Sequence, residues 1–285
     1  MSNLMTATVT QRGASKPVAG RNKETGQRIR LLSYNIQAGI STGRYRHYIT
    51  HSWKHVLPHA KRFSNLDRIA RLIGDYDVVG LQEVDAGSMR SGYVNLTQYL
   101  SEKSGLQFWY DQTNRRIGRL TSHSTGVLSR IQPAEIIEHR LPGRIPGRGA
   151  LFIRYGSKKA PLIVLILHLA LGQRARMRQL DYISEIVNEY RHVVLMGDLN
   201  CHSNSAEMDF LINRTMMREP FHGLDTFPSW RPQHNIDHIL VTPTLQVDRV
   251  KVLNYSLSDH LPIEMEITLP ESIHMASLSG SHPLT

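Results

Sequence analysis

The chain has 285 residues, of which 40% are hydrophobic and 20% are charged, a composition typical of a globular protein with a sizeable core. Its single cysteine, Cys201, excludes an intramolecular disulfide and a cysteine-rich zinc site, and we expect it to be buried and without a catalytic role. No apolar run approaches the roughly 20 residues of a membrane-spanning helix. We also see no secretory signal, so we expect a cytoplasmic location.

The formal net charge of +10 is unevenly distributed along the chain. Before residue 31, six basic residues against the single acid Glu24 give +5, half of the total. We expect residues 1–28 to be a disordered basic arm, residues 29–269 to form one folded domain, and residues 270–285 to be a flexible tail. A basic arm attracts nucleic acid or an anionic membrane surface without specificity. A solvated tail with no catalytic role is the other interpretation.

In chain order, hydrophobic periodicity predicts a strand at 30–36, a helix at 65–76 capped by Asn65, and a strand at 77–84. A helix at 92–104 follows and ends at Gly105. The next segments are strands at 125–128, 150–154 and 161–169, and the clearest helix, at 173–189. The remaining strands are predicted at 192–196, 236–241, 249–255 and 262–268. Many short strands with few helices favour an α/β (α+β) fold of two packed sheets with outer helices.

Four carboxylates lie where apolar strands end or begin, in separate parts of the sequence: Glu83, Asp198, Asp237 and Asp259. If they converge in one cleft they repel one another, so a divalent cation or a cationic histidine would be needed to keep them ionised. The amide side chains of Asn35 and Asn200 could add neutral oxygen ligands or hydrogen bonds. Because such a ligand set is rich in oxygen, it favours magnesium, or manganese, over zinc.

Two histidines accompany these acids. His168 ends the apolar run 162–167, and His260 directly follows Asp259. A single histidine at a strand end is more often a structural residue. Paired with a carboxylate, however, it is the usual source of a general base near neutral pH. Together with a metal ion, this pattern suits the attack of water on a phosphoester.

Six short motifs occur in order along the chain: Ser33-Tyr34-Asn35-Ile36, Leu81-Gln82-Glu83-Val84, Leu167-His168-Leu169, Gly197-Asp198-Leu199-Asn200, Asn235-Ile236-Asp237-His238-Ile239-Leu240 and Ser258-Asp259-His260. The series resembles the endonuclease/exonuclease/phosphatase superfamily, which has the DNase I-like fold. The resemblance spans residues 29–269. It implies a four-layer α/β/β/α sandwich of two packed mixed sheets with outer helices, and magnesium-dependent hydrolysis of a phosphoester.

By this resemblance, the metal ion would be held by Glu83, with Asn35 beside it and Asp259 as a second carboxylate on the metal side. Asp198 and Asn200 would orient the attacking water and the phosphate. These five residues would therefore form the metal and water side of the site.

The same resemblance gives roles to three catalytic residues and one arginine. His260 would act as the base or stabilise the phosphorane, and Asp237 would accept its other ring proton. His168 would donate a hydrogen bond to the phosphate. Arg148, in Gly147-Arg148-Gly149-Ala150, matches a phosphate-contacting arginine of part of the family, where flanking glycines would let the backbone approach an anion. A simple surface arginine is the alternative.

Residues 43–62 carry five basic residues and no acid, namely Arg44, Arg46, Lys54, Lys61 and Arg62, and place His47, His51, His55 and His59 at four-residue spacing. On a helix the histidines would form a stripe, which Pro58 would end before His59. The stripe could bind a metal, the segment could grip an anionic substrate or a membrane surface, or it could be a solvated amphipathic helix. The resemblance favours the anion interpretation, with Arg44 and Arg46 as phosphate-binding candidates.

Two other basic clusters are Arg115, Arg116 and Arg119, in an expected loop, and Arg174, Arg176 and Arg178, after His168. Arg174 and Arg178 share one face of the predicted helix, and Arg174 is a further phosphate-binding candidate. Charge clusters of this kind are more often solvated surface than binding sites.

The pattern departs from the DNA-repair members of the superfamily. Val84-Asp85 follows Glu83, and no mid-chain tyrosine matches theirs. The sequence is more similar to a bacterial branch of unassigned substrate, so a nucleic acid and a phospholipid or sugar-phosphate head group, with possible peripheral membrane contact, stay open. A catalytically silent module that binds an anionic partner is the alternative function, and the sequence does not give the oligomeric state.

Overall fold

The computed structural model describes residues 26–39, 60–118, 120–143, 147–273 and 275. Several predictions fall outside these ranges: the basic arm up to residue 25, the tail from residue 276, Arg119, and the segment that carries Arg44, Arg46, His47, His51, His55 and His59. No helix in the described ranges is long and apolar enough to cross a membrane.

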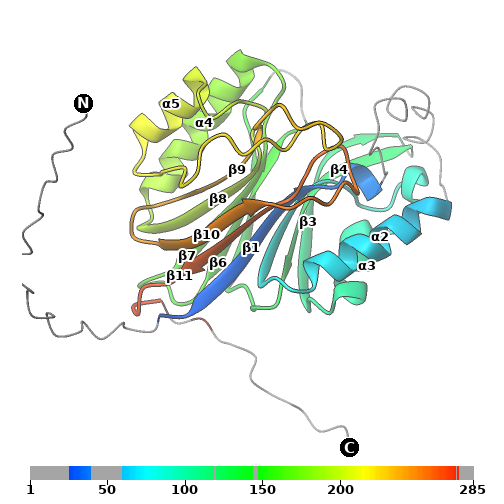
Figure 1. The fold of residues 1–285 in the computed structure, drawn as a ribbon, viewed down its shortest axis with the longest axis horizontal. Coiled ribbons are helices and arrows are strands. Elements are labelled where there is room, and N and C mark those ends of the chain that lie inside the picture. Colours follow the sequence, from blue (N-terminus) through cyan, green and yellow to red (C-terminus); the bar gives the residue numbers. More distant parts are fainter. Residues whose placement is uncertain (1–25, 40–59, 119, 144–146, 274, 276–285) are drawn as a thin grey trace, which may run out of the picture.

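Two mixed β-sheets form the centre of the molecule (Figure 1). The first has the order β10-β11-β1-β2-β4-β3, with bounds β1 Arg28–Asn35, β2 Val78–Asp85, β3 Phe108–Ile117, β4 Thr121–Ser129, β10 Gln246–Val252 and β11 Ile263–Thr268. The second has the order β5-β6-β7-β8-β9, with bounds β5 Glu135–Arg140, β6 Gly149–Tyr155, β7 Leu162–His168, β8 His192–Asp198 and β9 Asp237–Val241. Strands β1 and β2 are parallel, as are β7 and β8, and the other neighbours are antiparallel.

Helices cover the outer faces of both sheets. Helices α2 (Ala60–Ile73) and α3 (Leu96–Ser104) pack on the first sheet, and α4 (Gln173–Asn188) and α5 (Ala206–Arg214) on the second. In the described ranges the other helical turns are the 3-10 segments η1 (Gln37–Gly39) and η3 (Met89–Ser91). The predicted four-layer α/β/β/α sandwich is therefore confirmed.

Three apolar clusters correspond to the three interfaces between the four layers. Strand β7 shows why its sequence is apolar throughout. Val164 and Ile166 pack between the sheets, whereas Ile163 and Leu165 pack under α4 and α5. Both faces of the strand are buried, so the alternation of apolar and polar residues disappears. Ile273, beyond the expected end of the domain at residue 269, also belongs to the cluster between the sheets.

The structure corrects several predicted boundaries. Helix α2 begins at Ala60, so Asn65 lies inside it and is not its cap. The Asn65 side chain is buried, and its Nδ2 donates to the carbonyl oxygens of Gly39 (3.1 Å) and Leu257 (2.7 Å). The cap of α3 is Asn95, and that helix ends at Gly105 as predicted. The sequence did not predict β3, β5 and α5, and it placed Arg115 and Arg116 of β3 in a loop.

Candidate active site

The predicted site residues come together where β1, β7 and β8 end and β9 begins. The strand register pairs His168 with Asp198 and Asp198 with Asp237, so these three residues lie side by side across the second sheet. Asn35, the last residue of β1, reaches across from the first sheet. Its Nδ2 donates to Asp198 Oδ2 at 3.1 Å, and this hydrogen bond joins the two sheets at the site.

Asp198 is the central carboxylate and is only 2% exposed. Its Oδ1 accepts from the backbone N–H of Asn200 at 3.0 Å. On the other oxygen, His168 Nε2 lies at 3.6 Å and His260 Nε2 at 4.0 Å. Both distances exceed those of hydrogen bonds, so the two rings face the carboxylate without binding it directly.

The close approach of β8 to β7 beside Asp198 depends on Gly197, whose φ is 146°. A Cβ atom built there would lie 2.0 Å from the carbonyl oxygen of Leu167 on the neighbouring strand. No other residue fits this position without a shift of the backbone. The glycine thus brings Asp198 alongside His168.

His260 is bound on its other ring nitrogen. Nδ1 lies 2.7 Å from Asp237 Oδ2, and both side chains are buried. The same carboxylate oxygen accepts from Thr226 Oγ1 at 2.5 Å. Thr226, Asp237 and His260, from three separate segments of the sequence, are thereby linked in one buried series of hydrogen bonds.

The segment that supports this series of hydrogen bonds lies between α5 and β9 and was not predicted from the sequence. Besides Thr226, it contributes Phe227, whose ring centroid lies 4.8 Å from that of His260. Ser229 fixes the loop that carries His260, because its N–H donates to Asp259 O and its Oγ to Ser258 O. The only signal in the sequence is the run Thr-Phe-Pro-Ser at 226–229, which has neither strand nor helix periodicity.

Glu83 occupies an irregular position in β2. Its φ is 55°, in the left-handed region, and the register between β2 and β4 shifts between Leu81 and Val84. Such bulges re-aim a side chain and are frequent beside active sites. The Glu83 carboxylate is close enough to raise the pKa of both Asp198 and Asp259, which locates it at the same site.

The buried carboxylates disfavour one another's charge. Burial, together with the negative charges of Asp237 and Glu83, raises the pKa of Asp198 to about 7. Burial also raises the pKa of Asp259 to about 6, although His260 opposes the effect and Glu83 adds to it. Carboxyl groups with such values near neutral pH are common at functional sites.

The two histidines carry opposite shifts. Burial alone would lower the pKa of His260, but the charge and hydrogen bond of Asp237, with smaller contributions from Asp198 and Asp259, raise it to about 10. Burial lowers the pKa of His168 well below its usual value, and the positive charges of Arg148 and His260 add to this effect. His260 is therefore an imidazolium and His168 a neutral imidazole at neutral pH.

The donor set fits a hard divalent cation. Two mutually repelling carboxylates, Glu83 and Asp259, face a buried third, Asp198, and a cation among them would relieve the repulsion that contributes to the raised pKa values of Asp198 and Asp259. Ligand atoms of Asp198, Asp237 and His260 also lie within 4.8 Å of one another. Within that second group His260 and Asp237 already bind each other, so the carboxylates on the Glu83 side are the ones that could hold a cation.

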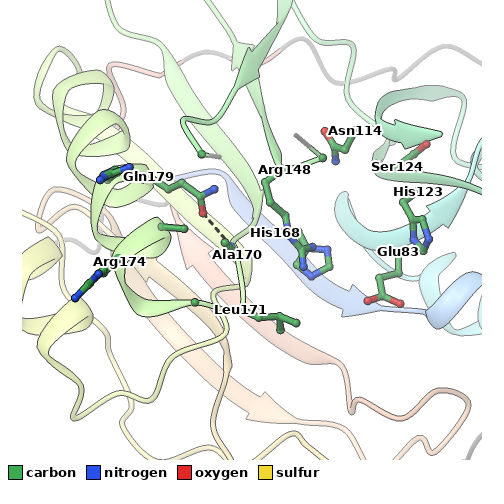
Figure 2. A pocket seen from close by; sticks show the side chains of 15 residues that line it. Glu83, Asn114, His123, Ser124, Arg148, His168, Ala170, Leu171, Arg174 and Gln179 are labelled. Carbon is green, nitrogen blue, oxygen red and sulfur yellow. Dashed lines mark hydrogen bonds between the residues drawn. The ribbon is translucent and has the colours of Figure 1, made fainter. Parts of the chain in front are cut away.

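A cleft of about 540 Å³ adjoins this cluster (Figure 2). Glu83 and His123 lie on one wall, His168 and Arg148 in the middle, and Arg174 on the opposite wall, formed by α4. The predicted phosphate-binding residues Arg148 and Arg174 thus both line the cleft that Glu83 and His168 also line.

The three arginines at the start of α4 do not all face the cleft. Arg174 and Arg178 line the cleft, but Arg176 instead binds Glu207 of α5, with its Nη2 2.6 Å from Oε1. Gly149 beside Arg148 has a packing role, because a Cβ there would lie 2.1 Å from Asn114 Oδ1. Its small size serves the contact with β3.

The structure thus brings together eight predicted residues: Asn35, Glu83, His168, Asp198, Asn200, Asp237, Asp259 and His260. Arg44 and Arg46 lie outside the described residues. Cys201, in the buried cluster under α4 and α5, has a thiol whose pKa burial raises to about 11, so it is a neutral thiol at physiological pH, as expected of a residue without catalytic function.

Comparison with known proteins agrees with this geometry. The family model described as the endonuclease/exonuclease/phosphatase family matches residues 32–260. Among curated proteins, no sequence matches the chain.

Similar solved structures include an endonuclease/exonuclease/phosphatase family protein from Bacteroides thetaiotaomicron, with a TM-score of 0.65 at 17% identity over 86% of this chain and 99% of that chain. A mannosyl-6-phosphatase from the same species has a TM-score of 0.63 at 18% identity, over 85% of this chain and 100% of that chain. The human Nocturnin catalytic domain with bound sulfate has a TM-score of 0.61 at 17% identity, over 85% and 94%. At these identities the likeness establishes the fold, whereas the family match covers most of the sequence. The chain belongs to the endonuclease/exonuclease/phosphatase family.

Proposed function

We propose that the protein is a magnesium-dependent phosphoesterase, in which an activated water attacks the phosphorus of a phosphodiester or phosphomonoester. The observation that carries the proposal is the arrangement around Asp198: a carboxylate with a pKa of about 7 faces an imidazolium, His260, that is held by Asp237. A base and a cationic hydrogen-bond donor therefore face each other, with His260 Nε2 4.0 Å from Asp198 Oδ2.

Glu83, Asp259 and Asn35 are the residues that would hold the magnesium ion; manganese would suit the same ligands. Once bound, the ion supplies positive charge to the phosphoryl oxygen as negative charge builds up there. The amide of Asn35 is fixed on both atoms, since Nδ2 donates to Asp198 and Oδ1 accepts from the Gln37 N–H at 3.2 Å. Its carbonyl oxygen keeps one lone pair for the ion.

Asp198 is suited to accept the proton of the attacking water. Its raised pKa makes the carboxylate basic enough for this role near neutral pH, since a catalytic base works best when its pKa lies near the operating pH. Asn200 is positioned by its Nδ2, which donates to Leu169 O at 3.0 Å. Asn200 would orient the water and the phosphate beside Asp198.

His260 is suited to donate a hydrogen bond to the phosphate and stabilise the pentavalent transition state. Its raised pKa favours this role over that of a base, because the ring is already protonated at neutral pH. His168, kept neutral by burial, would donate through Nε2 without adding charge. The two histidines therefore act on the phosphoryl oxygens in different charge states.

The size of the cleft and its arginines favour an anionic substrate larger than a phosphate group. Arg148 lies beside His168 and Arg174 lies on the wall formed by α4, so Arg148 could contact a phosphate oxygen and Arg174 a more distant anionic part of the substrate. One relative of the same fold is named a mannosyl-6-phosphatase and another is TDP2. A nucleic acid and a phospholipid or sugar-phosphate head group remain the two substrate classes, with membrane contact implied only for the lipid.

The test is hydrolysis of bis-p-nitrophenyl phosphate and p-nitrophenyl phosphate with and without Mg²⁺. We expect activity that EDTA abolishes and that Glu83→Gln and His260→Ala each lower by about 100-fold or more. His192→Ala is the matched control, because His192 is also a buried histidine but binds Thr244, at the opposite end of β8 from Asp198. Equal activity in all variants would overturn the proposal.

A panel of plasmid DNA, RNA, phospholipid vesicles, inositol phosphates and sugar phosphates then separates the substrate classes. Activity on duplex DNA should fall steeply with salt, since binding releases counterions from the phosphates. Activity on a lipid should require the vesicle surface. An inactive protein that still bound one of these anions would favour the alternative of a catalytically silent binding module.

A further inference from the structure

His238, the neighbour of Asp237 in β9, has no part in the mechanism above, yet both of its ring nitrogens are engaged. The side chain is 0% exposed. Nδ1 lies 2.7 Å from Glu219 Oε1, and Nε2 lies 2.8 Å from the carbonyl oxygen of Cys201. Successive strand residues point to opposite faces, so His238 faces away from the catalytic cluster and towards the loop that follows Asn200.

The partners fix where the ring protons lie. A carbonyl oxygen only accepts, so Nε2 of His238 must donate to Cys201. On the other side, Asn235 Nδ2 donates to Ser203 Oγ (3.0 Å), which leaves the Ser203 hydroxyl proton for Glu219 Oε1 (3.0 Å).

Glu219 accepts from this hydroxyl as a carboxylate. Burial would raise its pKa, but the hydrogen bond and charge of His238, with hydrogen bonds from Ser203 and His222, lower it. A carboxylate also only accepts, so Nδ1 of His238 donates to it. The ring is therefore held at both nitrogens, by Glu219 at Nδ1 and by the Cys201 carbonyl at Nε2.

We propose that His238, held in this orientation by Glu219, is a positioning residue for the phosphoesterase proposed above: it binds the Cys201 carbonyl and thereby sets the turn that presents Asn200. Asn200 has a φ of 52°, in the left-handed region that non-glycine residues rarely adopt. Such conformations persist only where the surroundings hold them. The turn is held before Asn200 by the Leu199 N–H, which donates to Ile236 O at 2.9 Å, and after it by His238.

The first experiment replaces the ring without its hydrogen bonds, by His238→Phe, and measures kcat and KM for bis-p-nitrophenyl phosphate with Mg²⁺. We expect kcat to fall by about tenfold or more while KM stays within about twofold, because a displaced turn misaligns Asn200 at the reacting phosphate. His192→Phe is the matched control, a buried strand histidine bound to Thr244 at the other end of β8. It should leave kcat unchanged after correction for the folded fraction.

A double-mutant cycle with Asn200→Ala separates positioning from general damage. If His238 acts through Asn200, His238→Phe should change kcat by less than about twofold in the Asn200→Ala background. Equal losses in both backgrounds would overturn the inference. If the wild type itself is inactive, or Asn200→Ala has no effect, the proposed function fails instead.

Glu219 variants keep the inference falsifiable should His238→Phe not fold. Glu219→Gln can still donate to or accept from Nδ1, so the bond from Nε2 to Cys201 should survive and kcat should stay within about threefold of the wild type, whereas Glu219→Leu should lose about as much as His238→Phe. Nitrogen-15 NMR of the histidine ring gives an independent measure. A protonated Nε2 on His238 at pH 7 would support the inference, and a bare Nε2 would contradict it.

Discussion

His260 and Asp237 form a buried pair in which Nδ1 of the ring lies 2.7 Å from Oδ2 of the carboxylate. Burial of a histidine normally favours its neutral form, so the aspartate is what keeps this ring positively charged. The pair therefore makes a buried histidine cationic, which is what its proposed role as a donor to a phosphate requires. The raised pKa of His260 follows mainly from the charge of Asp237 and from this hydrogen bond.

Replacing that charge is the most direct test of the pair. Asp237→Asn keeps the size of the side chain but removes the negative charge, so the pKa of His260 should fall below its present value of about 10. We expect kcat/KM at pH 8 to drop by roughly 10²–10⁴-fold, as for a buried aspartate that orients a catalytic histidine. Asp248→Asn, at an exposed aspartate of β10, is the control and should be silent. Unchanged activity in Asp237→Asn would contradict the role of the pair.

Thr226 supports Asp237 through the 2.5 Å hydrogen bond from its hydroxyl. Thr226→Val removes this bond with little change in volume, so Asp237 is less firmly held and His260 is less well oriented. We expect kcat to fall by about tenfold with KM nearly unchanged, since orientation of the reacting groups is lost and binding is not. Thr268→Val removes a similar bond to Asp248 far from the site. A loss of activity in both variants would point to general destabilisation.

The pH dependence follows from the two shifted groups. Asp198 must be ionised to accept a proton, so kcat/KM should rise with pH through about 7. His260 must be protonated to donate, so kcat/KM should fall again as pH passes about 10. A bound magnesium ion lowers the pKa of a neighbouring carboxyl, so the acid limb should move to lower pH as Mg²⁺ is raised. An activity that decreases steadily from pH 6 to 8 would contradict these assignments.

Much of the site could be predicted from the sequence because its residues terminate strands. His168 and Asp198 each end a strand whose two faces are buried, so the change from apolar to polar marks the strand end. Parallel neighbours such as β7 and β8 bring their carboxyl ends to the same edge of a sheet. The strand ends therefore indicated which side chains could meet, and the resemblance to a known family predicted that they share one site.

The supporting residues could not be predicted, since they act through contacts between distant segments. Thr226 lies in a loop, and its side chain contributes to the site through its hydrogen bond to Asp237. His238 shows no signal beyond its place next to Asp237, because its partners Glu219 and Cys201 lie 19 and 37 residues away in sequence. Spacing within the chain carries no information about such pairs.

The errors in the fold have equally local causes. Asn65 has the chemistry of a helix cap, but it satisfies its amide with the carbonyls of Gly39 and Leu257, 26 and 192 residues away. Strand β5 is an edge strand with most of its residues exposed, so it has no apolar face to detect. Helix α5 has nine residues, too short for a clear stripe.

Asp198 makes the site less stable than a neutral site of the same shape would be. Its pKa rises from 3.8 to about 7 on folding, so the folded protein disfavours the ionised form. Asp198 therefore adds stability only at low pH, below its unfolded pKa, and this contribution is lost as pH rises through about 7. The same burial that makes the carboxylate basic thus opposes folding at neutral pH.

Asp198→Asn should abolish activity, because it removes the proposed base. It should also raise the melting temperature, because it removes a buried charge that opposes folding. In the presence of EDTA we expect a rise of roughly 3–8 °C at pH 8, corresponding to a few kcal/mol, and almost none at pH 4, where the aspartate is already protonated in the folded state. Scanning calorimetry at both pH values measures the difference. Asp209→Asn, at an aspartate in the first turn of α5, is the control and should show no gain at pH 8. A melting temperature that falls at pH 8 would mean that the Asp198 charge is stabilised by its neighbours, and the repulsion that suits this site to a cation would then be absent.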